Sequence, residues 1–200
     1  TPEVVTHSRK GKIRAAIRLA RFQIARAEAE TLKSSAENDP EAETMFADAL
    51  WGEALFDEAE AAYQEAFKQH PLWPRAQFGV ARSLATHGQL NQALKVAQAA
   101  YAAAPKDPGV LVLLGDLYER LYRFDDAAKV LEEYVDGLPR RLRGDSEVAS
   151  LKVKFLKAFT GRSPVTIEGD PAAVHTVPFT LRERKILVAA EVNGRRMDFV

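Results

Sequence analysis

Apolar residues recur every three or four positions over most of this chain, and that spacing predicts helices rather than strands. Three successive stretches with this pattern begin with a proline, at Pro40, Pro74 and Pro108. Proline fits the first turn of a helix, because the N–H that it lacks would have no partner there. The pattern therefore predicts helices that start at these prolines. Their apolar positions are Phe46 and Leu50, Val80 and Leu84, and Leu111, Leu114 and Tyr118.

The three stretches belong to a repeat of 34 residues. The same interval separates Pro71, Pro105 and Pro139, and also Ala59, Ala93 and Ala127. Six of the ten prolines thus fall on two ladders, which define units at 40–73, 74–107 and 108–141. Short turns at ALFDEA, GQLNQA and YRFDDA divide each unit into two antiparallel helices, and proline ends the second helix.

Residues 40–141 resemble three tetratricopeptide repeats. The third unit follows the family pattern best, at Leu111, Leu114, Gly115, Tyr118, Ala127 and Pro139. Tyr134 departs from it, because the other units have Ala66 and Ala100 at that position. The resemblance implies a mainly α fold, a helix-turn-helix solenoid in which the first helix of each unit lines a concave groove. Grooves of this family accept an extended peptide or a partner helix.

The resemblance also implies which side chains line the groove. They are Asp48 and Trp51 from the first unit, Arg75, Phe78 and Arg82 from the second, and Asp116, Glu119 and Arg120 from the third. Aromatic and arginine side chains are frequent interface anchors, so these residues are the predicted partner-binding set. An alternative is that the N-terminal helix occupies the groove and buries Trp51 and Phe78. The family's clamp for a C-terminal carboxylate is replaced here by Thr44, Asp48 and Gly109, which disfavours binding of chaperone tails.

Residues 1–39 are predicted to form a basic amphipathic helix, running from Ser8 to about Ala36. Its apolar face carries Ile13, Ile17, Ala20, Ile24 and Ala27. Seven basic and no acidic residues lie between Arg9 and Arg26, whereas Ser34–Phe67 holds ten acidic and no basic residues. The favoured interpretation is that the basic helix packs on the first repeat. Attachment to an anionic membrane is the alternative, and nucleic acid is disfavoured because no binding motif accompanies the charges.

The chain beyond the repeats is predicted to contain a capping helix at 142–161, a linker at 162–175 and a β-hairpin at 176–200. The apolar stripe of the capping helix is Val148, Leu151, Phe155, Leu156 and Phe159. Strand character is found at Thr176–Arg182, Lys185–Val192 and Met197–Val200, with Asn193-Gly194 suited to a tight turn. So short a hairpin forms no core of its own. One expectation is therefore self-association through its exposed edge.

The stretch VPFTLRERKILVAAEVNGRRMDFV resembles the opening of a retropepsin-like aspartic protease domain. The resemblance implies that a catalytic Asp-Thr-Gly or Asp-Ser-Gly would follow, but the chain contains neither. Asp198 comes too early in the pattern for that role. No catalytic residue is therefore assigned, and this chain is predicted not to be an enzyme. The alternative is that it forms part of an aspartic endopeptidase whose catalytic motif lies beyond residue 200.

Composition narrows the function further. The formal net charge is zero, so no global field recruits nucleic acid or lipid, and the absence of cysteine excludes disulfides and thiolate metal sites. The four histidines are far apart, and no phosphate-binding or hydrolase motif occurs, so no cofactor or metal is predicted. The chain begins with Thr1, which leads us to expect that an upstream segment is removed, as in periplasmic, secreted or membrane-tethered proteins. The compartment itself stays open.

The sequence thus predicts a protein-interaction scaffold that binds a peptide or partner protein in a concave groove. It could serve as the regulatory or substrate-recruiting region of a larger bacterial-type aspartic protease. A self-association module is a further alternative.

Overall fold

The computed structural model describes residues 2–36, 38–139, 147–159, 161, 176–182, 185–192 and 194–199. The chain divides into two compact units, Thr1–Pro164 and Val165–Val200, which are treated separately below. The first unit is helical and the second is a small sheet, so the predicted mainly α class with a C-terminal β segment is confirmed.

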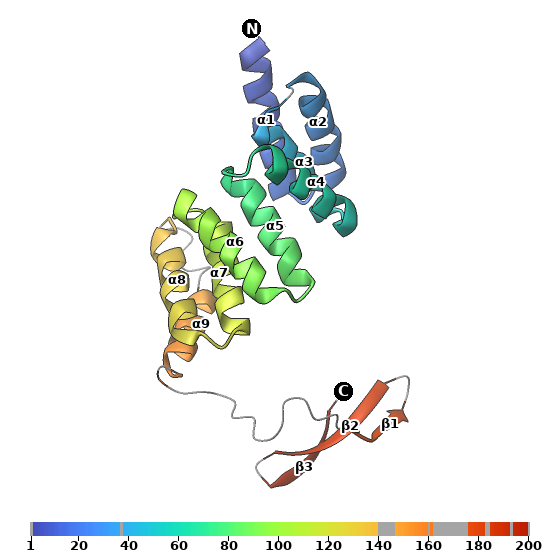
Figure 1. Cartoon of the computed structure of the whole chain (residues 1–200), viewed down its shortest axis with the longest axis vertical. Helices are drawn as coiled ribbons and strands as arrows, with labels where there is room; N and C mark the ends of the chain where they lie inside the picture. The colour runs from blue at the N-terminus through green and yellow to red at the C-terminus, as the bar shows by residue number, and fades with distance from the viewer. Residues whose placement is uncertain are drawn as a thin grey trace. The chain divides into compact units, whose positions relative to one another are not determined.

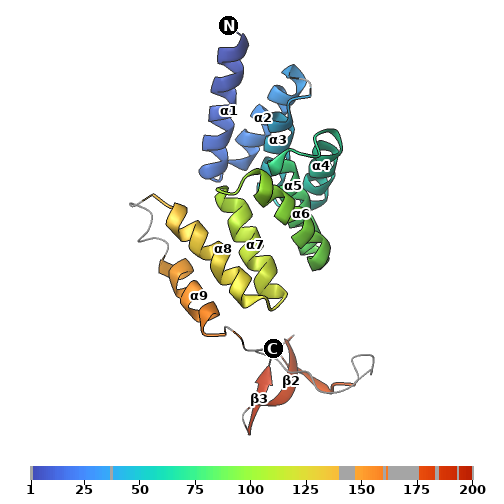
Figure 2. The same ribbon diagram turned by 60° about the vertical axis from the view of Figure 1, so that its left-hand side comes forward.

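The helices of the first unit form consecutive antiparallel pairs, and each helix packs against the next one in the chain (Figures 1 and 2). The first members of successive pairs also contact one another, α1 with α3, α3 with α5, and α5 with α7. They therefore form one layer of the solenoid. The bounds are α1 Pro2–Arg18, α2 Phe22–Ser35, α3 Pro40–Gly52, α4 Phe56–Gln69, α5 Pro74–Thr86, α6 Leu90–Ala103, α7 Pro108–Arg120, α8 Phe124–Gly137 and α9 Glu147–Lys157.

The starts of α3, α5 and α7 confirm the helices predicted from the prolines. Two of them are capped by the preceding aspartate. Asp39 accepts hydrogen bonds from the backbone N–H groups of Glu41 and Ala42, and Asp107 accepts one from Val110. Such caps satisfy N–H groups that have no partner within the helix, so an Asp-Pro pair fixes the start of α3 and of α7.

The N-terminal region differs from its prediction. One helix from Ser8 to Ala36 was expected, but the chain reverses between α1 and α2 at Ala20, which has a φ of +54°. Residues 2–36 are therefore a fourth helical pair. The sequence held the signal, because Phe22 and Ala25 extend the 34-residue ladders of Phe56 and Ala59. The series of prolines did not reveal this fourth pair, because the residue equivalent to Pro40 is Thr6.

Small residues set the distance between helices. Ala25, Ala59, Ala93 and Ala127 have no exposed surface. Glycine is required where a ring approaches more closely: a Cβ on Gly79 would lie 2.0 Å from the ring of Tyr63. Tyr134 breaks the series of Ala66 and Ala100, and it stays half-buried against the core.

The capping helix α9 is confirmed near Glu147, but its predicted stripe is wrong in part. Val153 and Leu156 are the buried residues, whereas Val148, Leu151 and Phe155 are exposed by 76%, 55% and 60%. Two ion pairs hold this orientation, and they join Lys152 to Glu119 and Lys157 to Glu132. The predicted residues 142–146 and the linker 162–175 lie outside the described residues.

The second unit is a three-stranded antiparallel sheet, and its strands fall within or close to the three segments that were predicted to have strand character. Its strands are β1 Phe179–Arg182, β2 Lys185–Val192 and β3 Arg195–Phe199, in the order β1-β2-β3. The register pairs Phe179 with Val188, and Val188 with Phe199. Gly194 has a φ of +74°, as the predicted tight turn requires, while Asn193 lies outside the described residues.

A left-handed residue ends the first helix of each pair, and this predicts a stabilising substitution. Ala20, Ala54, Gly88 and Tyr122 have φ values of +54°, +61°, +73° and +59°. Alanine is strained there, whereas glycine is not. Ala54→Gly should raise the free energy of unfolding by about 0.5–1 kcal/mol in urea titrations. Ala61→Gly, inside α4, is the control and should lower it by about the same amount; stabilisation by both, or by neither, would contradict the prediction.

Candidate functional site

The eight predicted groove residues form two separate groups. Asp48, Trp51, Arg75, Phe78 and Arg82 meet between α3 and α5, together with Tyr63 of α4. Asp116, Glu119 and Arg120 lie on α7 and pair elsewhere.

Asp48 is the centre of the first group. Arg75 binds it with two hydrogen bonds, from Nε to Oδ2 at 2.9 Å and from Nη2 to Oδ1 at 2.7 Å. The Tyr63 hydroxyl donates to the same Oδ1 and accepts from Arg82 Nη2 at 2.6 Å. The carboxylate of Asp48 is therefore already occupied by two partners within the chain, because a fork of Arg–carboxylate bonds is among the stronger hydrogen-bonded pairs.

Aromatic rings cover the arginines of this group. The guanidinium of Arg82 lies 3.9 Å from the ring centre of Trp51 and 5.1 Å from that of Phe78, and Arg75 lies 4.4 Å from Phe78. Phe78 is only 7% exposed, and it belongs to the hydrophobic core that α5, α6 and α7 share. The two arginines stack over its ring, and its predicted role as a groove-lining anchor stays a prediction.

Burial and the shared carboxylate set the protonation of the group. Burial, and then the charge of Asp48, raise the pKa of Tyr63 well above its ordinary value, so the hydroxyl stays a donor. Burial opposes the charge of Arg75, but Asp48 outweighs it and the pKa of Arg75 is raised. Burial lowers the pKa of Arg82, whose Nε is enclosed without a hydrogen-bond partner. The group is a charged network that joins two repeats.

The second group is more open. Arg120 lies 3.7 Å from Asp116 one turn earlier on α7, and Asp116 keeps 53% of its side chain exposed. Glu119 pairs with Lys152 of α9 at 2.5 Å, which ties the capping helix to the last repeat. Asp116 and Arg120 therefore present charge to solvent, whereas Glu119 serves a contact within the chain.

A cavity of about 590 Å³ opens on the layer of first helices. Its walls come from α1, α3, α5 and α7, and it contains Asp48 and Arg75 of the predicted set. The contribution of α1 was not predicted, because the fourth pair was not recognised. Arg14 would have been found from the 34-residue ladder, on which it precedes Asp48, Arg82 and Asp116. The other lining residues are Ile17, Arg18, Glu41, Thr44, Met45, Trp73, Asp107, Pro108 and Gly109.

Most basic residues of the N-terminal pair face carboxylates of the same chain. Lys10 lies 2.6 Å from Asp39 and 2.9 Å from Glu41. Burial alone would lower the pKa of Lys10, but hydrogen bonds to these two carboxylates raise it. Five of the seven pair in this way, namely Arg9, Lys10, Lys12, Arg14 and Arg26. Within the described part of the chain, Arg18 and Arg21 are exposed cations without an ion pair.

Several pairs between neighbouring repeats share one spacing. Arg14–Glu41, Arg26–Glu53, Glu43–His70, Asp48–Arg75 and Glu60–His87 are each 27 residues apart. That number is one repeat less about two helical turns. In Arg14–Glu41 and Asp48–Arg75 the partner therefore lies in the equivalent helix of the next repeat, and in the other three pairs it is the residue that caps the end of the intervening helix. The charges thus help to hold the register of stacking.

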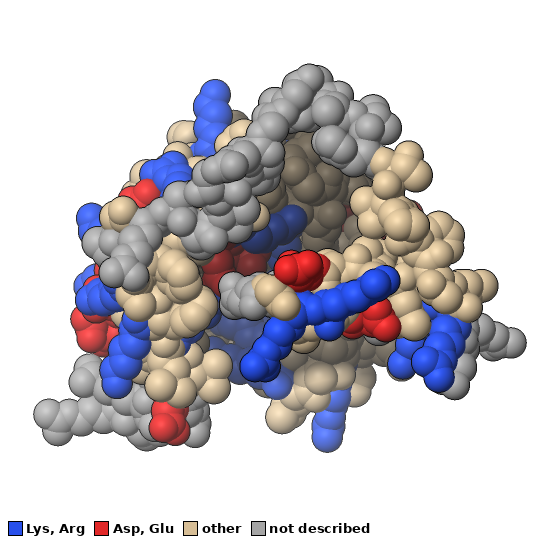
Figure 3. All heavy atoms as spheres, turned by 90° about the horizontal axis from the view of Figure 1, so that it is seen from below, with Lys and Arg blue, Asp and Glu red and all other residues tan. Residues whose placement is uncertain are grey.

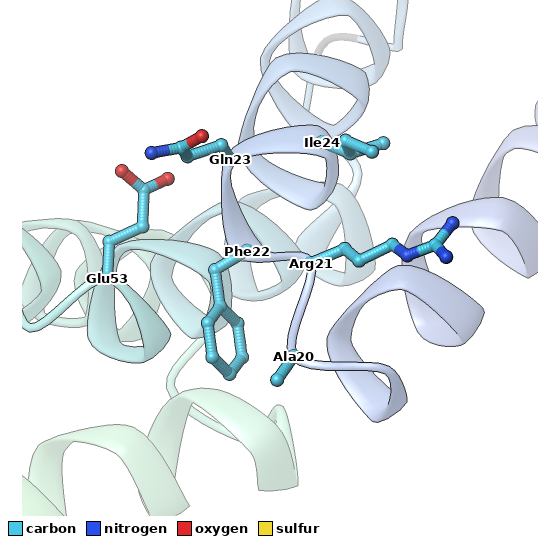
Figure 4. Close-up of a pocket in the computed structure, with 6 residues that line it drawn as sticks. All are labelled: Ala20, Arg21, Phe22, Gln23, Ile24 and Glu53. Atoms are coloured by element: carbon cyan, nitrogen blue, oxygen red, sulfur yellow. The ribbon is translucent and has the colours of Figure 1, made fainter.

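A second cavity, of about 610 Å³, lies at the turn between α1 and α2 (Figure 4). Figure 4 shows Arg21 pointing away from Phe22, Gln23 and Glu53. Glu53 already pairs with Arg26 at 3.3 Å, so this cavity brings no reactive groups together. Where the chain is described, it holds no cluster of side chains suited to a metal ion. Nor does any described helix combine the length and the apolar character needed to cross a membrane.

Both signs of charge are interspersed on the face drawn in Figure 3, which agrees with a net charge of zero. No single-sign field of the kind that binds nucleic acid is visible in that view.

Comparison with known families identifies the helical unit. Two family models described as tetratricopeptide repeat match residues 44–108 and 84–155. Together they span residues 44–155, so the chain belongs to the tetratricopeptide repeat family. The resemblance stated from the sequence is thereby confirmed for the repeats.

Solved structures agree on the fold. The chain is similar to TTC0263, a thermophilic TPR protein of Thermus thermophilus, with a TM-score of 0.61, 15% identity, and coverage of 76% of this chain and 81% of that one. It is similar to MamA AMB-1, with a TM-score of 0.57, 15% identity, and coverage of 78% and 89%. It is also similar to the TPR domain of Arabidopsis OM64, with a TM-score of 0.51, 18% identity, and coverage of 60% of this chain and 94% of that one. At these identities the likeness shows the fold alone.

A comparison with curated proteins found no significant match. Neither family model reaches residues 176–200, so the resemblance of that segment to retropepsin-like proteases gains no support from them.

The network at Asp48 predicts a large difference between two aspartates at equivalent repeat positions. Asp48→Ala leaves Arg75 and Arg82 without their carboxylate, and we expect the free energy of unfolding to fall by about 2 kcal/mol, since Arg75 keeps some contact with water. Asp116→Ala removes only an exposed pair and should cost less than about 0.5 kcal/mol. Urea unfolding of both variants measures the difference, and equal losses would refute the role given to Asp48.

Proposed function

We propose that this protein is a non-catalytic scaffold that binds an extended segment of a partner protein across its layer of first helices. The observation that carries the proposal is the 590 Å³ cavity, because its walls come from four successive repeats. A segment lying there would contact several repeats at once, and the solenoid would hold those contacts at fixed distances. Membership of a family that binds protein partners supports the proposal.

The charge pairs decide which side chains are free to bind. Asp48 and Arg75 satisfy each other, so we assign them to the wall that keeps the groove rigid. Trp51 is half-buried, and its ring packs against Arg82 and Phe56. Arg18 lines the cavity and has no ion pair within the described chain. On α7, the apolar side chain of Val112 is 45% exposed. The partner segment would therefore combine an acidic group near Arg18 with apolar residues.

Two arginines at one turn provide a matched test of the groove. Peptides that bind the chain would be selected from a random displayed library and their affinities measured by fluorescence anisotropy. Arg18→Glu should weaken binding by about tenfold, because it places a like charge against the acidic group. Arg21→Glu makes the same charge change outside the cavity and should alter affinity by less than about twofold. Equal effects of the two variants would contradict binding in this groove.

Other proposals have less support. Attachment of the N-terminal pair to an anionic membrane is disfavoured, because most of its cations already face carboxylates. The link to an aspartic protease rests on the sequence resemblance of residues 176–200 alone. It is tested by reading the codons after Val200: an Asp-Thr-Gly or Asp-Ser-Gly motif within a few residues would support it, and its absence would end it.

A further inference from the structure

One face of the sheet in residues 179–199 is almost wholly apolar. The register sets Phe179, Val188 and Phe199 side by side in one row. Because side chains alternate along a strand, the residues two positions away share that face. Its six largest apolar side chains are Phe179, Leu181, Ile186, Val188, Met197 and Phe199.

The opposite face has a different character. It carries Thr180, Arg182, Lys185, Glu191, Arg196 and Asp198, with Leu187 and Ala189 between them. The sheet is therefore amphipathic, and such a sheet normally covers its apolar face with another layer. Within this unit no second layer covers that face: Phe179, Leu181 and Ile186 are exposed by 63%, 70% and 55%. Met197 and Phe199 are exposed by 49% and 43%.

We infer that this apolar face packs against the same face of a second copy of the chain, forming a two-layer sandwich of two sheets. The face is apolar on all three strands, because the central strand carries Ile186, Val188 and Ala190, and phenylalanines stand on both outer strands. Apolar inner faces of this kind interdigitate in sandwiches.

The area is sufficient for such a contact. Five side chains exposed to this degree present on the order of 500 Å² of apolar surface per copy. Two copies together bury roughly 1,000 Å², which reaches the lower limit for specific protein interfaces.

The distribution of charge is compatible with a second copy. Arg182, Lys185 and Arg196 lie on the polar face, so packing two apolar faces together buries none of these cations. Only Arg195 stands at the end of the apolar face among the described residues. An apolar face with so little charge matches another copy of itself.

Neighbouring residues of β1 provide a matched pair of variants. Sedimentation equilibrium of the full chain should show a reversible dimer. Leu181→Glu buries a carboxylate in the contact and should weaken the dimer by at least about tenfold. Thr180→Glu puts the same charge on the polar face and should leave the association within about twofold of the unchanged chain. Equal weakening by both variants would overturn the inference, because that is the result expected if the two chains pair through their strand edges instead.

A second measurement does not depend on introducing a charge. The chain has no cysteine, so one introduced cysteine reports a single position. Sheets that pack face to face lie about 10 Å apart, which a bis-maleimide of about that length spans. Ile186→Cys should cross-link two chains and Leu187→Cys should not. A monomer at every concentration, or co-sedimentation of the monomer with phosphatidylserine vesicles that Leu181→Glu abolishes, would overturn the inference. Dimerisation should persist in Arg18→Glu, so failure of the groove proposal would remain distinguishable.

Discussion

The structure depends on how closely two helices approach at one alanine in each pair. Ala25, Ala59, Ala93 and Ala127 have no exposed surface, and a larger side chain at any of them would push the second helix away from its neighbours. A helical pair of this length cannot bury its apolar face alone, so it is stable only when the next pair stacks on it. The spacing of 34 residues is therefore a packing constraint, and it places the first helices in one layer where a partner can reach several of them.

The same constraint explains which parts of the fold could be predicted. Pro40, Pro74 and Pro108 fix helix starts through local backbone chemistry, so the sequence alone located α3, α5 and α7. The pair α1–α2 was missed because no proline stands at Thr6, although Ala25 and Phe22 obey the packing ladder. The spacing of apolar residues in α9 also did not predict which face of the helix is buried. Its apolar residues surround more than one face, and Val153 and Leu156 are the ones that pack into the core of the preceding repeats.

The sequence indicated which helices carry the candidate residues, but not which of these residues bind each other. The ladder correctly brings Asp48 and Arg75 to the layer of first helices, but sequence spacing gives no sign that they bind each other. Pairs 27 residues apart join Arg14 to Glu41 and Asp48 to Arg75, and the next such position would join Arg82 to residue 109. That residue is Gly109, so Arg82 has no carboxylate there. It contacts the Tyr63 hydroxyl and the ring of Trp51 instead.

This substitution of glycine for a charged partner has a consequence for binding. Residue 109 is the third position in this series of pairs, and because it is glycine it contributes no side chain. Gly109 borders the cavity together with Asp107 and Pro108. Charges that are satisfied within the chain resist a partner, since binding would have to break a desolvated pair. Selectivity must then come from the few groups left unpaired, above all Arg18, and from exposed apolar surface such as Val112. In the proposed groove, Asp48 and Arg75 are thus bound to each other, and the partner would have to be recognised by groups such as Arg18.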